Sequence, residues 1–109
     1  MLTITRANIR CSTLARLCLF TVDLIDHKAE ADRYAVPDLL SLISEQTEAL
    51  VSATEGSSDN SLLIDAGCLA QAARELYDPH GGAHNDEAAA VLYQLEGVLS
   101  CAECDDFSA

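Results

Sequence analysis

The 109-residue sequence has few basic residues, few aromatic residues and no tryptophan. Six Lys and Arg residues stand against 18 Asp and Glu residues, which gives a formal net charge of −12. Phosphates and anionic lipids repel such a chain, so we expect its acidic part to bind neither nucleic acid nor a membrane surface. With only three Tyr and two Phe residues, the core must consist mainly of Leu, Ile, Val and Ala, a composition that favours packed helices.

The sequence contains no apolar run of about 18 residues, so we expect no transmembrane helix. Residues 1–22 carry three Arg and no acid, which loosely matches a transit peptide, but the simpler interpretation is the first part of the folded domain. The five cysteines do not resemble a disulfide framework, and we therefore expect a reducing, cytoplasmic environment. Half of the residues are apolar, which predicts a single folded domain over residues 1–109, with 1–11 as an arm and 105–109 as a frayed tail.

Helical spacing of apolar residues predicts a first helix over about residues 12–33. Residues 2–5 before it fit either a short strand or an earlier start of the same helix. Pro37 and Asp38 suit the first turn of a second helix, because proline lacks an N–H and a carboxylate is favoured at the positive end of the dipole. This second helix should end before Gly56, in a loop rich in turn residues.

A third helix is expected from about Ser61 to Tyr77, and a fourth after Asn85, which should act as its N-cap. Small residues on the third helix would allow a neighbouring helix to approach closely: Ala66, Gly67, Ala70 and Ala73. Four amphipathic helices joined by short loops predict an all-α fold, a compact antiparallel bundle of about four helices.

The first helix has more apolar surface than one side of a small bundle requires. Leu17, Phe20 and Leu24 contribute to this surface, and we expect them at an oligomer interface, such as that of a homodimer. One functional alternative is therefore a structural helical subunit that self-associates through its first helix.

No sequence motif indicates catalysis or cofactor binding, so we expect neither an enzyme nor a cofactor. The pairs His80–His84 and Cys101–Cys104 have zinc-like spacing. However, the predicted fourth helix would separate His84 from Cys101 by roughly 25 Å, whereas two ligands of one zinc ion lie about 4 Å apart. We therefore expect no metal site, and the acids around Cys101 and Cys104 predict sluggish thiols.

Acidic residues recur on one face of the second predicted helix, in steps of three and four and without any Lys or Arg. The polar residues on this face are Asp38, Ser41, Glu45, Glu48, Ser52 and Glu55. On or just after the third helix, Asp65, Glu75 and Asp78 extend the acidic surface. We expect the carboxylates of these two helices to bind a partner, and the alternative is an ordinary solubilising surface.

The charge is also unevenly distributed along the chain. Residues 1–33 hold five bases and four acids, whereas residues 34–109 hold one base and fourteen acids. The basic start, with Arg6, Arg10 and Arg16, could contact an acidic partner or RNA, but neutralising the chain's own carboxylates is the simpler role.

The acidic stripe of Asp38, Glu45, Glu48 and Glu55, with the later carboxylates, makes residues 34–106 resemble in composition the small acidic inhibitors of phages and mobile elements, including anti-CRISPR and anti-restriction proteins. The resemblance involves no shared motif and assigns no residue. It implies a non-enzymatic inhibitor that docks on the basic, nucleic-acid-binding surface of a partner protein.

Overall fold

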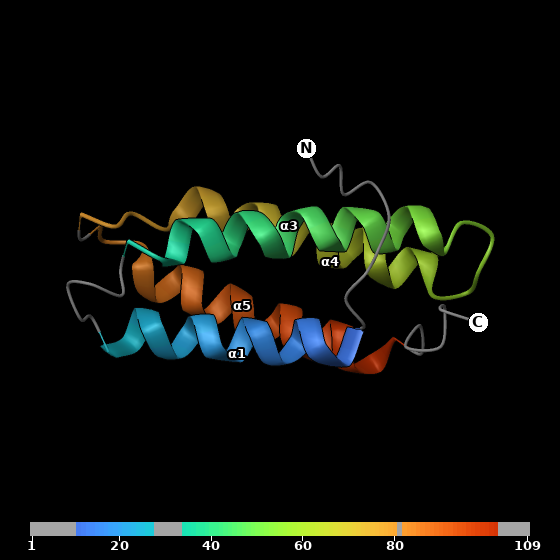
Figure 1. Ribbon diagram of the computed structural model, residues 1–109, viewed down its shortest axis with the longest axis horizontal. Helices are drawn as coiled ribbons and strands as arrows, with labels where there is room; N and C mark the ends of the chain where they lie inside the picture. Colours follow the sequence, from blue (N-terminus) through green and yellow to red (C-terminus); the bar gives the residue numbers. More distant parts are fainter. Residues whose placement is uncertain (1–10, 28–33, 81, 103–109) are drawn as a thin grey trace.

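The computed structural model describes residues 11–27, 34–80 and 82–102 of the chain. Four helices run side by side and alternate in direction: α1 (Cys11–His27), α3 (Val36–Ala53), α4 (Asn60–Leu76) and α5 (Asn85–Cys101) (Figure 1). No strand occurs in these three described segments. The prediction of an all-α antiparallel four-helix bundle is therefore confirmed. The expectations for residues 1–10, 28–33 and 105–109 concern positions outside the described residues.

The starts of α3 and α4 agree with the sequence pattern, whereas the start of α5 differs in its cap. Pro37 lies in the first turn of α3, as expected, and α4 begins at Asn60, one residue before the predicted start. Asn85 is the first residue of α5, and His84 occupies the N-cap position without a capping hydrogen bond from its side chain. The prediction that Asn85 caps α5 is wrong, because its side-chain amide is used elsewhere, in the turn that joins α4 to α5.

The core lies along the axis of the bundle and receives large apolar side chains from every described helix. Leu14, Ile43, Leu63 and Leu95, one from each helix, have no exposed surface. Burial of each such side chain stabilises the fold by about 1.5–3 kcal/mol. The other buried residues of α4 are alanines, namely Ala66, Ala70 and Ala73.

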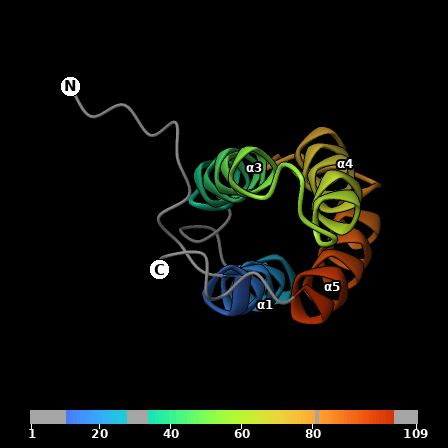
Figure 2. The ribbon, with the colours of Figure 1, turned by 90° about the vertical axis from the view of Figure 1, so that its right-hand side faces the viewer.

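The helices form a ring when the bundle is viewed along its length (Figure 2). In this ring α5 packs extensively against both α1 and α4, and α3 packs more closely against α4 than against α1. No described helix combines the length and the apolar character needed to cross a membrane.

The cysteines differ in state. Cys11 is disulfide-bonded to a partner outside the described residues, although the sequence pattern indicated no disulfide framework. Cys18, Cys68 and Cys101 are free thiols, of which Cys18 is buried and the other two are exposed. Burial raises the pKa of the Cys18 thiol from its ordinary value of 9.0 to about 12, with a smaller contribution from the negative charge of Glu96.

Candidate protein-binding surface

All seven carboxylates that the sequence predicted as partner-binding residues are exposed. They occupy α3, α4 and the turns that follow them: Asp38, Glu45, Glu48, Glu55, Asp65, Glu75 and Asp78. On α3 the acidic residues face away from Leu40, Ile43 and Leu50, which are buried in the core. The helical period alone produces this separation, because the acidic and the apolar residues each recur at steps of three or four.

The acidic surface has little positive charge nearby. From Val36 to Leu76, Arg74 is the single Lys or Arg. Arg74 lines a small groove of about 300 Å³ with Pro37 and Tyr77, beside the first turn of α3. No ion pair joins Glu48, Glu75 or Arg74 to another residue in the described part of the chain. From Val36 to Leu76, negative charge therefore outweighs positive charge on this surface.

A larger open groove of about 530 Å³ runs between the outer surfaces of α3 and α4. We call it the α3–α4 groove, and it is lined by Glu48, Val51, Ile64, Gly67, Cys68, Gln71, Ala72 and Glu75. Its lining is mainly apolar, and we call these apolar residues its floor; Glu48 borders it from α3 and Glu75 from α4. The Gln71 Nε2 donates a hydrogen bond of 3.1 Å to the Glu75 Oε2, so this carboxylate is held beside the groove.

Small side chains explain why the groove is open. At Gly67 an added Cβ would lie 3.9 Å from the Thr47 Cγ2, which is ordinary van der Waals contact, so α3 leaves room for a methyl group there. That the small residues of this helix permit close approach of a neighbour stays a prediction. Gly67 has no side chain and Ala72 has only a methyl group, so little fills the groove beside the exposed Ile64 and Cys68.

The sequence did not reveal this groove. Helical spacing predicts Val51 on the apolar side of the second helix and Glu48 and Glu75 on the acidic surface, and it gives no role to Ile64 or Cys68. Val51 is half-buried, and Ile64 is 48% exposed. Val51 lies at the edge of the apolar face of α3, and Ile64 is an exposed apolar residue of α4. Only the packing of α3 against α4 brings these two residues together.

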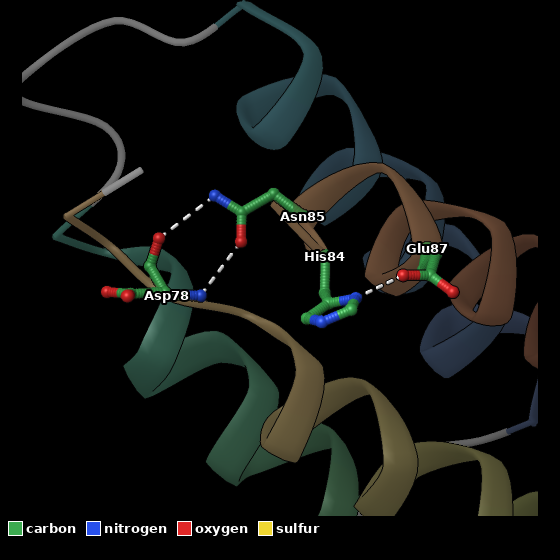
Figure 3. A network of polar contacts seen from close by, with 4 residues as sticks. All are labelled: Asp78, His84, Asn85 and Glu87. Carbon is green, nitrogen blue, oxygen red and sulfur yellow. Dashed lines mark hydrogen bonds and ion pairs between the residues drawn. The ribbon is translucent and has the colours of Figure 1, made fainter. Parts of the chain in front are cut away.

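Asp78 belongs to a polar turn rather than to the groove. Its Oδ1 accepts a hydrogen bond from the His80 backbone N–H at 2.8 Å. The Asn85 side chain links to the Asp78 backbone twice: its Oδ1 accepts from the N–H at 2.8 Å, and its Nδ2 donates to the carbonyl oxygen at 2.9 Å (Figure 3). Asp65 is exposed on α4 but does not line the groove.

The zinc-like residues do not converge in the described part of the chain. His84 Nδ1 contacts the carboxylate of Glu87 (Figure 3), and the His80 ring lies edge-on to Tyr34 with centroids 6.1 Å apart. Among the described residues, no three His, Cys, Asp or Glu side chains form a group that could hold a metal ion. Cys101 is the last residue of α5 and is exposed, and Cys104 lies outside the described residues.

The three residues expected at an oligomer interface have different environments. Leu17 and Leu24 are half-buried and pack against the core of their own chain. Phe20 is 53% exposed and therefore offers apolar surface to solvent. Much of the apolar excess of α1 is thus used inside the bundle.

No protein-family model matches this chain, and neither a curated protein nor a solved structure matches it. The geometry and charge of the molecule are therefore the basis for its proposed function.

Proposed function

We propose that this protein is a non-enzymatic binding module that docks its acidic α3–α4 side on a basic protein surface that otherwise holds nucleic acid. In this role it acts as an inhibitor. The observation that carries the proposal is the line of exposed carboxylates on α3 (Asp38, Glu45 and Glu48) continued by Glu55, on a helix without any Lys or Arg.

The carboxylates of α3 act together as an array rather than through single ion pairs. One exposed ion pair contributes only about 0.2–1 kcal/mol, which is too little to define a binding site. Several carboxylates of one sign on a rigid helix create a field that accelerates association with a basic partner and disfavours acidic ones. A groove that binds phosphates has the complementary charge, so the module and a nucleic acid would compete for it.

The test is capture of partners from an extract of the organism that encodes the protein, at about 50 mM and about 500 mM salt. We expect specific capture at low salt, loss at high salt, and displacement by added DNA or RNA. The decisive variant neutralises four carboxylates: Asp38→Asn, Glu45→Gln, Glu48→Gln and Glu55→Gln.

A matched control changes the net charge equally on α1 and α5. It carries Asp23→Asn, Asp26→Asn, Asp86→Asn and Glu96→Gln. We expect this control to capture the partner as the native protein does. Equal capture by the first variant and the native protein would remove the α3 surface from the proposal.

A helical homo-oligomer is the second candidate function, and the exposed Phe20 is the observation that favours it. Light scattering at high micromolar concentration tests this candidate. A dimer that dissociates on Phe20→Ser would support it, and a monomer at all concentrations would exclude it.

A further inference from the structure

We propose that the α3–α4 groove binds the apolar face of a basic amphipathic helix supplied by the partner. This inference rests on the proposed function and specifies the partner's structure: a helix with an apolar stripe flanked by Lys or Arg. It adds an apolar contact to a surface otherwise described only by its charge.

The shape of the groove suits a helix. Six of its eight lining residues come from α4 and two, Glu48 and Val51, from α3, so the groove follows α4 past the last turns of α3. On α4 the lining residues extend from Ile64 to Glu75. Eleven steps at 1.5 Å rise give a length of about 16 Å, which corresponds to about three turns of a helix lying in the groove. A helix of this length offers anchors at positions i, i+3 or i+4, and i+7.

The floor of the groove is apolar and partly exposed to water. Ile64 is 48% exposed, although isoleucine is among the residues most often buried. Val51, Gly67 and Ala72 extend the apolar surface beside it. A partner's leucine or phenylalanine placed here would remove the exposed part of Ile64 from water, which is favourable in proportion to the area buried.

The charge of the lining selects among apolar partners. One carboxylate from each helix borders the groove, Glu48 from α3 and Glu75 from α4. A helix with Lys or Arg on both sides of its apolar stripe would pair with both carboxylates, and an acidic helix would be repelled. The same carboxylates disfavour an anionic membrane surface as the occupant.

Cys68 provides a direct probe of occupancy, because it is a free, exposed thiol in the groove. Cys101 is free and exposed outside the groove and serves as an internal control. The probe ligand is a synthetic helical peptide of about 18 residues with leucines at steps of three and four, flanking lysines, and alanine elsewhere. We expect saturating peptide to slow iodoacetamide alkylation of Cys68 by about tenfold and to leave the alkylation rate of Cys101 unchanged, as read by mass spectrometry.

Two peptide controls separate charge from shape. A peptide with glutamate in place of lysine should not protect Cys68. A peptide of the same composition, with its leucines spread around the helix, should bind at least tenfold more weakly. Equal binding of the spread peptide would overturn the inference, because an apolar stripe would then be unnecessary.

Substitution of Ile64 distinguishes this inference from the proposed function. Ile64→Ser keeps every charge and is expected to weaken peptide binding by about tenfold, whereas Phe20→Ser removes an exposed apolar residue outside the groove and should change nothing. If Ile64→Ser binds as the native protein does while Glu48→Gln with Glu75→Gln weakens binding, the groove inference fails and the charge-based function stands. The proposed function fails separately, when neutralising the α3 carboxylates leaves capture of the partner unchanged.

Other occupants would also be visible. Protection of Cys68 without peptide that increases with protein concentration would identify a second copy of the chain in the groove. Protection without peptide at every concentration would identify a segment of the same chain. Either result would overturn the assignment of the groove to a partner's helix.

Discussion

The helix pairs α1–α5 and α3–α4 are both antiparallel neighbours in the same bundle, yet their contacts differ in kind. The first pair contributes mainly large buried side chains: Leu14, Cys18 and Val22 from α1, and Leu92, Leu95 and Leu99 from α5. In the second pair, α3 contributes large side chains such as Leu40, Ile43 and Leu50, whereas α4 contributes three alanines and a single large buried residue, Leu63. The buried face of α4 is therefore the one made mainly of small residues.

This difference separates stability from surface chemistry. Large side chains in the α1–α5 pair remove apolar area from water, which is the main source of the free energy of folding. The α3–α4 pair leaves apolar atoms such as those of Ile64 in a groove between carboxylates. The buried face of α3 also supports the fold through Leu40, Ile43 and Leu50, so only the outer surface of this pair is available to a partner.

The largest expected effect contrasts the two pairs directly. Leu14→Ala should lower the free energy of unfolding by about 2–5 kcal/mol, because Leu14 is fully buried and its removal leaves a cavity. Ile64→Ala should cost less than about 1 kcal/mol, because half of that side chain already contacts water. Urea unfolding measures both values. Similar losses would break the comparison, since Ile64 would then belong to the core.

The second prediction uses the buried thiol of α1. The pKa of Cys18 is raised to about 12, so the folded state holds this proton more tightly than the unfolded chain, whose thiol titrates near 9.0. The resulting stability is fully present below pH 9 and is lost as the pH rises from 9 towards 12, by up to about 4 kcal/mol. Urea unfolding at several alkaline pH values tests this dependence.

Two alanine variants provide the controls for this pH dependence. Cys18→Ala should remove most of the alkaline loss. Cys68→Ala should leave it unchanged, because Cys68 is an exposed thiol on the opposite helix pair. An alkaline loss that persists in Cys18→Ala would mean that another group causes it.

The third prediction concerns the polar turns at the two ends of α4. Asn60 Nδ2 donates to the Val51 carbonyl oxygen at 2.9 Å, and Asn85 Nδ2 donates to the Asp78 carbonyl oxygen at the same distance. Each amide thus satisfies a carbonyl near the end of the preceding helix. Asn85→Ala should cost about 1 kcal/mol, and Asn60→Ala a similar amount. A negligible loss for either, measured by thermal unfolding, would show that water replaces its hydrogen bonds.

Periodicity predicted the number of helices and the outward direction of the α3 carboxylates, because both follow from the geometry of one helix. It is less accurate for α4, where helical spacing predicts Leu62 and Leu69 on one inward face with Ala66 and Ala73. Leu62 and Leu69 are half-buried, whereas Leu63, which this spacing leaves off that face, is fully buried. Apolar residues cover a wide arc of α4, so its pattern does not locate the centre of the buried face.

The features that escaped prediction all depend on contacts between distant segments. Asn85 looked like an N-cap in sequence, but its amide bonds to Asp78 seven residues earlier. The α3–α4 groove requires the relative position of two helices, which no pattern within α3 or within α4 contains. Charge could be read from the sequence, whereas the apolar floor beside it could not.

The smallest expected effect tests the spacing between α3 and α4. Gly67 and Gly97 both lie inside helices, and each Gly→Ala change should raise the free energy of unfolding by about 0.5–1 kcal/mol through helix propensity. At Gly97 nothing lies within 4 Å of the new methyl group, and at Gly67 the nearest atom, the Thr47 Cγ2, is 3.9 Å away. Equal gains in urea unfolding would agree with this spacing. A loss at Gly67 with a gain at Gly97 would show that α3 and α4 approach more closely than the structure indicates, and the groove above them would then be correspondingly shallower.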